Sequence, residues 1–157
     1  MGDEEHMRAA IAESALAVKE DGAMPFGAVL VKGGEMVLTA RNACKRSAKR
    51  GGSADVTRHA EVELVRKMCG EGGVPPEERS ACTVYTSTEP CVMCAGALAW
   101  SGVGAVVYGA SVEELAKVSG PGGFDIPIKE LYQRCPRAIE VRGPVCEAEA
   151  IAAHKDS

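Results

Sequence analysis

Two cysteines carry the clearest chemical signal in this sequence. Cys91 and Cys94 lie three positions apart in the run Pro90–Cys94. Because proline is favoured in the first turn of a helix, we expect a helix from Pro90 to about Ser101, with both cysteines on one face of its N-terminal end. The positive end of the helix dipole favours thiolates over thiols there. Two thiolates at this spacing are typical of half of a zinc site.

A third ligand is expected upstream, at His59. This histidine opens a predicted helix over 59–69, and helices that follow neighbouring strands can bring their N-termini to the same edge of a sheet. Three protein ligands with an open fourth position indicate a catalytic zinc site rather than a structural one. Glu61 can then accept a proton from a water molecule at the metal and pass it to a substrate. His59 and Glu61 can share one site only at a helix end, which is where the pair is predicted to lie.

The two motifs also occur together in a known arrangement. His59-Ala60-Glu61, followed downstream by a Pro-Cys-x-x-Cys run ending at Cys94, matches the signature of zinc deaminases. On these residues the chain resembles the cytidine deaminase-like superfamily, nearest the branch of guanine, cytosine and tRNA-adenosine deaminases. The resemblance implies an α/β fold, a three-layer α/β/α sandwich with a five-stranded mixed sheet. It also implies one Zn²⁺ per subunit, held by His59, Cys91 and Cys94 with a bound water or hydroxide.

The implied reaction is the hydrolytic removal of an exocyclic amine from a nucleobase-like ring, with release of ammonia. Glu61 would protonate a ring nitrogen and then the leaving amine, and the backbone N–H groups of Ala60 and Cys91 would orient the attacked carbon. Asn42 matches the asparagine that contacts the base in this branch, and Phe26 lies in a segment that lines the pocket. From the residues alone, Asn42 is equally a turn residue after a strand and Phe26 a core residue.

The substrate is predicted to be a free nucleobase or a related amino-substituted ring (guanine-, cytosine- or triazine-like) or the corresponding nucleoside. Gly123-Phe124-Asp125 resembles bacterial guanine deaminases, in which the C-terminal segment crosses to a partner subunit and covers the site, so Phe124 is a candidate substrate contact. The residues Ala152–Ser157 lack the aromatic end of that branch. A carboxylate for the leaving amine could come from Glu147, Glu140 or Glu149, each of which is equally typical of a solvated surface.

Two other functions compete with this prediction. Thr88–Ala97 is similar to tRNA-adenosine deaminases, and a basic cluster favours nucleic acid (Lys45, Arg46, Lys49 and Arg50). The formal net charge of −4 argues against tRNA, because phosphate contacts supply much of the affinity for nucleic acids. The other alternative is a non-catalytic binding module stabilised by zinc, with Cys82 as a fourth ligand. Cys82 is predicted at the far end of its strand, which disfavours that site.

The rest of the sequence predicts one domain, 1–157. Helices are expected over 4–20 (with Asp3 as its cap), 59–69, 90–101, 112–118, 127–133 and 145–153, and strands over 26–31, 36–40, 81–86, 105–109 and 138–142. A hairpin followed by alternating helices and strands indicates a mixed sheet covered on both faces. No apolar run approaches the roughly 20 residues of a membrane span, and the acidic start does not resemble a targeting peptide.

Seven cysteines, an odd number at irregular spacing, indicate a reducing cytoplasm rather than a disulfide framework. The five outside the motif are expected to be structural or incidental. His6 and His154, near the two ends of the chain, are expected at the surface. The resemblance and the glycines within 120–123 predict a homodimer, in which the C-terminal segment could be exchanged between subunits.

Overall fold

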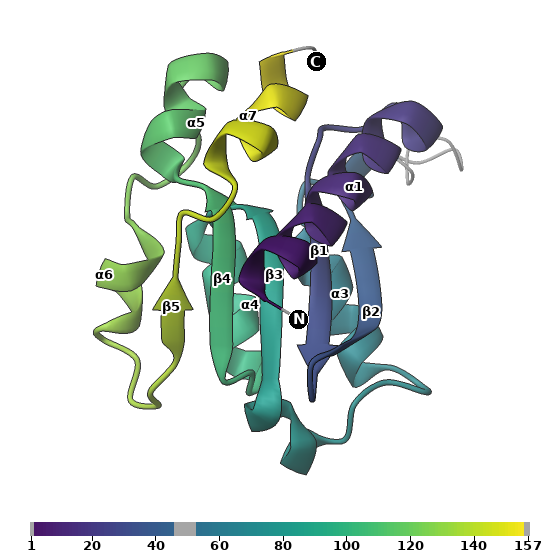
Figure 1. Ribbon diagram of the computed structural model, residues 1–157, viewed down its shortest axis with the longest axis vertical. Coiled ribbons are helices and arrows are strands. Elements are labelled where there is room, and N and C mark those ends of the chain that lie inside the picture. The colour runs from purple at the N-terminus through teal and green to yellow at the C-terminus, as the bar shows by residue number, and fades with distance from the viewer. Residues whose placement is uncertain (1, 46–52, 156–157) are drawn as a thin grey trace.

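The apolar strands form one five-stranded sheet in the computed structural model, which describes residues 2–45 and 53–155 (Figure 1). The strands are β1 (Gly27–Lys32), β2 (Glu35–Arg41), β3 (Cys82–Thr88), β4 (Ala105–Ala110) and β5 (Glu140–Arg142), in the spatial order β2-β1-β3-β4-β5. β1 is antiparallel to both β2 and β3, whereas β3, β4 and β5 are parallel to one another. The predicted mixed sheet is confirmed.

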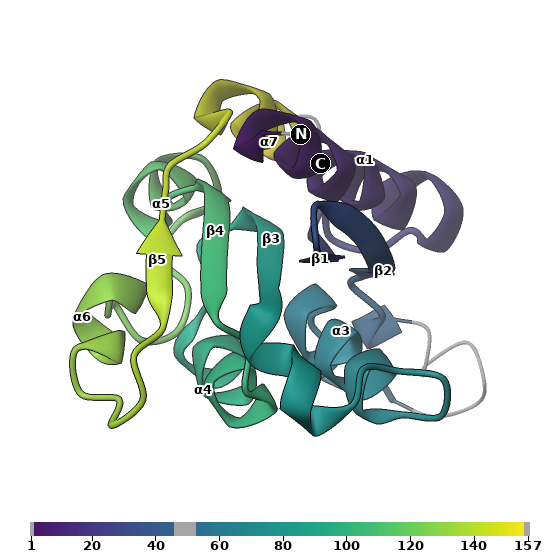
Figure 2. The same cartoon turned by 60° about the horizontal axis from the view of Figure 1, so that its bottom comes forward.

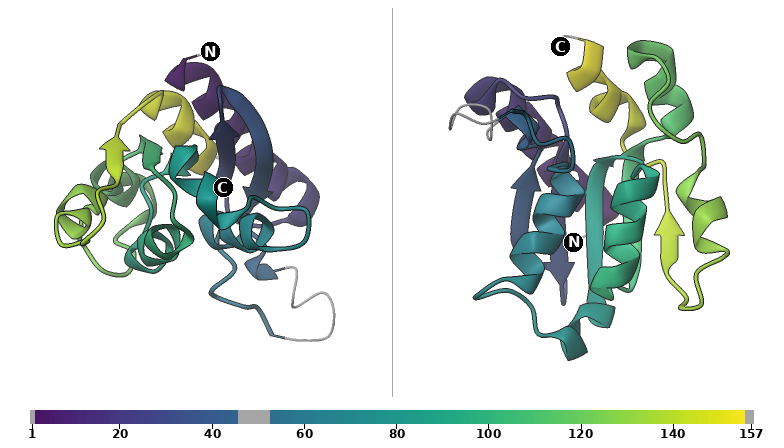
Figure 3. Two further views of the ribbon diagram at one scale, coloured as in Figure 1. Left: turned by 90° about the horizontal axis from the view of Figure 1, so that it is seen from below. Right: turned by 180° about the vertical axis from the view of Figure 1, so that it is seen from behind.

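Helices connect the strands and cover both faces of the sheet. They are α1 (Asp3–Asp21), α3 (Ala60–Cys69), α4 (Val92–Ser101), α5 (Val112–Ser119), α6 (Ile128–Tyr132) and α7 (Glu147–Lys155), with a short 3-10 helix, η1 (Pro76–Ala81), before β3. α3 and α4 lie side by side on one face, and α1 and α7 lie across the other (Figures 2 and 3). The three-layer α/β/α arrangement is therefore as predicted.

Alternating strand residues build a separate apolar core under each helical layer, because successive side chains of a strand point to opposite faces. Towards α3 and α4, buried strand residues such as Leu30 and Val84 pack with Leu64 and Leu98. Towards α1, a second set packs together (Met7, Ala10, Val29, Val31, Tyr85 and Val107). β1 lies very close to α1, since a Cβ on Gly27 would stand only 2.3 Å from the carbonyl oxygen of Ala10.

Asp3 does not cap α1 as predicted. The N-cap residue is Gly2, and Asp3 is already the first helical residue. Its carboxylate is used over a longer range: it accepts a hydrogen bond from the Tyr85 hydroxyl at 2.6 Å and two from the Arg142 guanidinium at 2.9 and 3.0 Å. The sequence could not indicate this, because Tyr85 and Arg142 come from β3 and β5. Asp3 thus fastens α1 to the sheet.

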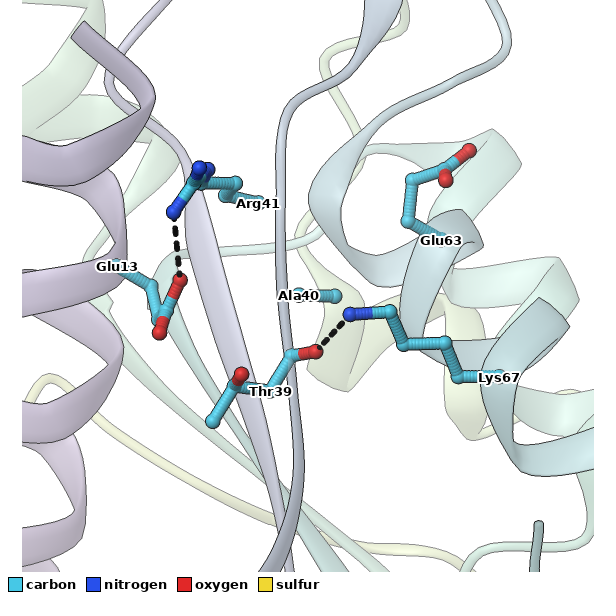
Figure 4. Close-up of a pocket in the computed structure, with 6 residues that line it drawn as sticks. All are labelled: Glu13, Thr39, Ala40, Arg41, Glu63 and Lys67. Carbon is cyan, nitrogen blue, oxygen red and sulfur yellow. Dashed lines mark hydrogen bonds and ion pairs between the residues drawn. The ribbon is translucent and has the colours of Figure 1, made fainter. Parts of the chain in front are cut away.

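The exposed edge of β2 is covered by charged side chains from the helices on either side (Figure 4). Lys67 of α3 donates to the carbonyl oxygen of Thr39 at 2.6 Å. On the α1 side, Arg41 forms ion pairs with Glu13, Glu20 and Asp21. Lysine beside an edge strand is a common way to block pairing with a further strand. The small polar pocket at this edge, about 240 Å³, is therefore lined by charges that already have partners.

The C-terminal helix α7 packs against α1, α5 and β4 of its own chain (Figure 1). Ala150 and Ile151 are the buried apolar residues of this contact. Among the residues that the structure describes, no helix combines the length and the apolar character needed to cross a membrane.

Candidate active site

His59, Cys91 and Cys94 come together where α3 and α4 begin. His59 is the N-cap of α3 and Cys91 the N-cap of α4, while Cys94 lies in the first turn of α4. Nδ1 of His59 lies 3.7 Å from Sγ of Cys91 and 3.4 Å from Sγ of Cys94. The helices begin at Ala60 and Val92, slightly later than predicted, because His59 and Cys91 keep an extended backbone. Both therefore lie at a positive helix end.

One nitrogen and two sulfurs within 4.8 Å of one another fit a zinc ion, whose usual protein ligands are histidine and cysteine. A hydrogen bond from Cys94, and then the contact with His59, lower the pKa of Cys91 to about 4 although burial opposes the shift. The pKa of Cys94 is raised, because its thiol hydrogen-bonds to Cys91 and is buried. A divalent cation between the sulfurs favours the loss of both protons. The donor set therefore suits a metal better than it suits free thiols.

Glu61 lies beside this cluster, in the first turn of α3. Its side chain is only 4% exposed, and one carboxylate oxygen accepts a hydrogen bond from the hydroxyl of Thr86 in β3. The pKa of His59 is raised chiefly by its hydrogen bond with Cys91, and the negative charge of Glu61 adds to that shift. His59 at the N-cap and Glu61 in the first turn both reach the cleft, so the spacing of two residues is compatible with a shared site.

The cluster opens into a cleft of about 790 Å³. His59, Glu61, Cys91, Thr88 and Phe26 are among the residues that line it. Most of the remaining lining comes from one stretch, residues 111–127, which we call the outer wall. The lining residues include four carboxylates (Glu61, Glu89, Glu113 and Asp125) and neither lysine nor arginine among the residues that the structure describes. A cleft of this charge favours a neutral or cationic ligand.

A family model agrees with this geometry. The model described as the cytidine and deoxycytidylate deaminase zinc-binding region matches residues 1–110. The chain belongs to this family. Membership confirms the family and fold that the motifs predicted, and it confirms the prediction of a deaminase, a hydrolase that acts on C–N bonds.

Relatives with different named substrates cover most of the chain. A probable cytosine deaminase from Schizosaccharomyces pombe is 35% identical over 156 residues, which are 96% of this chain and 88% of the relative. A guanine deaminase from Bacillus subtilis is 36% identical over 118 residues, or 75% of this chain and 67% of the relative. A solved structure from work on A-to-I editing by tRNA:A34 deaminases superposes with a TM-score of 0.69 at 26% identity, covering 95% of this chain and 98% of that one. The family thus includes both base and tRNA deaminases.

Two of the predicted substrate-binding residues of this family member line the cleft, and two others do not. Phe26 and Phe124 both line the cleft, and Phe124 is 72% exposed on the outer wall. Ala60 is fully buried as the first residue of α3 and does not line the described cleft. Asn42 is also buried, and its side-chain oxygen accepts a hydrogen bond from the backbone N–H of Cys44. This contact agrees with the turn interpretation of Asn42, and its proposed contact with a base stays a prediction.

The three acidic residues near the C-terminus are held by partners and do not themselves line the cleft. Glu147 accepts a hydrogen bond from the backbone N–H of Ser111 at 2.9 Å. Glu149 forms an ion pair with Arg8 and Glu140 forms one with Arg142. None of the three lines the described cleft. Their predicted role beside a leaving amine therefore has no support in the geometry of this chain.

Cys82 lies far from the other candidate ligands. It begins β3, and its thiol hydrogen-bonds to the backbone carbonyl of Glu78. Thr88 ends the same strand near the cleft, about 20 Å away for a strand of this length. Cys82 therefore cannot complete a closed four-ligand site with Cys91 and Cys94. The basic cluster of the sequence is described only at Lys45, which is exposed, and its other members lie outside the described residues.

Two histidines expected at the surface are buried. His6 and His154 are each 4% exposed, and the ring of His154 meets the ring of Phe26 edge-on with centroids 5.1 Å apart. Burial lowers the pKa of His154, which favours its neutral form. Because α7 folds back over the sheet, a residue near the end of the chain reaches the back of a cleft residue. Sequence position alone could not indicate this contact.

Glu89 is a further cleft residue that the motifs left unassigned. It directly precedes Pro90 and follows β3, and it is 8% exposed. A carboxylate is seldom buried unless it has partners, but a sequence shows neither burial nor partners. The only signal available was its position at a strand end beside the metal motif.

Proposed function

We propose that this protein is a zinc-dependent deaminase of a free nucleobase or related amino-substituted ring, such as guanine, cytosine or an aminotriazine, or of the corresponding nucleoside. The observation that carries the substrate class is the cleft beside the His59, Cys91 and Cys94 cluster, which has carboxylates in its lining and no described lysine or arginine. A nucleotide or a nucleic acid would bring phosphate groups that such a lining cannot neutralise.

In this proposal His59, Cys91 and Cys94 hold one zinc ion. The metal, when bound, supplies Lewis-acid activation of a water molecule. Glu61 accepts a proton from that water at the carboxylate oxygen that Thr86 does not contact, and delivers it to a ring nitrogen. It then accepts the second proton from the hydroxyl now on the attacked carbon and delivers that proton to the leaving amine. The amine departs as ammonia, and the ring keeps the oxygen. The backbone N–H groups of Ala60 and Cys91, both at helix starts, orient the attacked carbon.

Two aromatic residues favour a planar ring as the substrate. Phe26 and Phe124 both line the cleft, and Phe124 belongs to the outer wall. Aromatic faces bind flat heterocycles through stacking and apolar contact. The acidic side chain of Asp125 can accept hydrogen bonds from ring N–H and amino groups, which guanine, cytosine and aminotriazines all carry.

Ammonia release by the purified zinc-loaded protein tests this proposal. The panel comprises cytosine, guanine, adenine, their nucleosides, aminotriazines and tRNA stem-loops. We expect turnover of at least one base, triazine or nucleoside and none of the stem-loops. Turnover of the stem-loops alone, with salt-sensitive binding, would establish the tRNA-adenosine deaminase alternative, which the solved tRNA:A34 deaminase relative favours.

Glu61→Gln separates catalysis from a zinc-stabilised binding module. The variant should keep the wild-type zinc content while ammonia release falls by about 10²–10⁴-fold, the usual contribution of general acid–base catalysis. Glu113→Gln is the matched control, since it removes an exposed carboxylate from the same cleft. Full activity in Glu61→Gln would contradict the proposed role of Glu61, and an inactive wild-type protein with stoichiometric zinc would favour the binding module.

The assembly and the location of the protein stay predictions. We propose a homodimer, supported by α4, which has no charged residue and yet exposes Met93 by 39% and Trp100 by 92%. The order of the sheet and its two cores supports the chain acting as a single domain. The seven thiols without a disulfide among them support a reducing cytoplasm. Exchange of the C-terminal segment between subunits would require α7 to leave the α1, α5 and β4 surface that it covers.

A further inference from the structure

Glu89 connects the metal-binding segment to the outer wall of the cleft. Its backbone N–H donates to the carbonyl oxygen of Ala110, the last residue of β4, at 2.7 Å. One oxygen of its carboxylate accepts a hydrogen bond from the backbone N–H of Val112 at 3.1 Å. The other accepts one from the backbone N–H of Ile128 at 2.8 Å. A single buried side chain therefore holds the first residues of both α5 and α6.

These two attachment points enclose most of the outer wall. Between them, residues 119–125 are all exposed. Among the residues that the structure describes, no hydrogen bond joins residues 121–126 to the rest of the chain. Phe124, which faces the cleft, belongs to this span. The position of the span therefore depends on how its two ends are held.

A carboxylate suits this position for two reasons. The first N–H groups of a helix have no acceptor within the helix, so they need an outside partner. Both donors lie at helix starts, where a negative charge is favoured, and hydrogen bonds to a charged acceptor are stronger than neutral ones. A glutamine of the same shape offers one oxygen and one NH₂ group, so it can satisfy only one of the two donors.

We propose that Glu89 is a positioning residue, which sets the separation between the outer wall and Cys91 and thereby the width of the substrate cleft. Pro90 links Glu89 directly to Cys91, so the wall and the metal ligand share one anchor. Glu89 acts on the substrate through Phe124 and its neighbours on the wall. The effect on substrate binding rests on the proposed function, whereas the effect on the wall does not.

Hydrogen exchange of the zinc-loaded protein, measured by mass spectrometry, tests the effect on the wall. In Glu89→Gln, at least one of the two amides that Glu89 holds, that of Val112 or that of Ile128, should exchange about tenfold to a hundredfold faster, the effect of losing one hydrogen bond to a charged acceptor. Peptides from β3 and α4 and the zinc content should match the wild type. Glu147→Gln is the control, because Glu147 binds the N–H of Ser111 at the start of α5 but has no bond to Ile128. This control should leave the exchange of the Ile128 amide unchanged.

Kinetics test the effect on the substrate that the ammonia panel identifies. In Glu89→Gln we expect KM to rise about tenfold while kcat stays within about threefold, because the wall binds the ring but takes no part in the proton transfers. A panel without any substrate would contradict the proposed function alone, since the exchange measurement needs no substrate. A tenfold fall in kcat in Glu89→Gln, with no change in KM, would contradict the role of Glu89 in setting the cleft width.

Two exchange results would overturn the proposal. One is unchanged exchange of both Val112 and Ile128 in Glu89→Gln, and the other is equal acceleration across the sheet, which would indicate a general loss of stability. If Glu89→Gln does not fold, hydrogen exchange of the wild-type protein tests the proposal without a variant. The N–H groups of Val112 and Ile128 should be protected relative to that of Glu113, for which the described part of the chain provides no acceptor. Fast exchange of Val112 and Ile128 would refute the proposal.

Discussion

The hydroxyl of Thr86 determines how Glu61 is held, and Thr86→Val removes that hydroxyl with little change of shape. Thr86 is fully buried in β3, and Glu61 is 4% exposed, so water cannot replace the lost donor. A hydrogen bond to a charged group contributes about 1.5–3 kcal/mol. We expect Thr86→Val to lower the free energy of unfolding by this amount. The same energy, lost from the orientation of the carboxylate, corresponds to a fall in kcat of about 10- to 150-fold.

Thr83 provides a matched control on the same strand. It is half-buried, and its hydroxyl has no hydrogen bond recorded among the described residues. Thr83→Val should therefore change the free energy of unfolding by no more than about 0.5 kcal/mol. Urea unfolding followed by circular dichroism, on zinc-loaded protein, gives the free energies. Steady-state ammonia release gives kcat.

Two outcomes would refute the reasoning about Thr86. The first is a Thr86→Val protein with wild-type stability and wild-type kcat, which would mean that the hydroxyl is not needed to hold Glu61. The second is a loss of stability in Thr83→Val as large as that in Thr86→Val, which would mean that valine destabilises β3 for reasons unrelated to Glu61. A loss of stability without loss of kcat would confine the role of Thr86 to folding.

Two further predictions concern the ends of the fold and its outer surface. Asp3→Asn should cost about 1 kcal/mol at pH 7, a modest value because Asp3 is one-third exposed. The hydrogen bond from Arg142 holds the pKa of Asp3 below its usual 3.8. The difference in free energy of unfolding between the wild type and Asp3→Asn is therefore complete above pH 3.8 and is lost as the pH falls further. A difference in urea unfolding that grew towards pH 3 would contradict this prediction. Trp100→Asp should sediment as a monomer with wild-type unfolding, because Trp100 is 92% exposed, whereas Val56→Asp, at a residue 75% exposed, should keep the dimer. A dimeric Trp100→Asp would exclude the α4 surface as the interface.

The candidate metal ligands could be predicted because their signal is local. Cys91 and Cys94 belong to one helix start, and His59 and Glu61 belong to another. Each pair is positioned mainly by its own backbone, so spacing and helix geometry were sufficient. The sheet was predictable for a similar reason, because apolar strands alternating with helices allow few arrangements.

Contacts between distant segments were not predictable in the same way. Glu89 binds N–H groups 23 and 39 positions later in the chain, and a backbone N–H group has no sequence signature. His154 is buried because α7 folds back over the face of the sheet that α1 covers, where the His154 ring meets Phe26. The Asp3 interaction with Arg142 joins residues 139 positions apart. In each case a polar residue typical of a surface acquires its role from packing.

The two margins of the sheet have a consequence for crowded solutions of this protein. Along β2, Lys67 already occupies a carbonyl oxygen, and Arg41 lies on the other side (Figure 4). At the opposite margin, β5 is only three residues long. Charged side chains beside β2 and the shortness of β5 both hinder pairing with a foreign strand. We therefore expect copies of this chain to meet through helices and loops, so that concentrated samples yield particles of fixed size instead of fibrils.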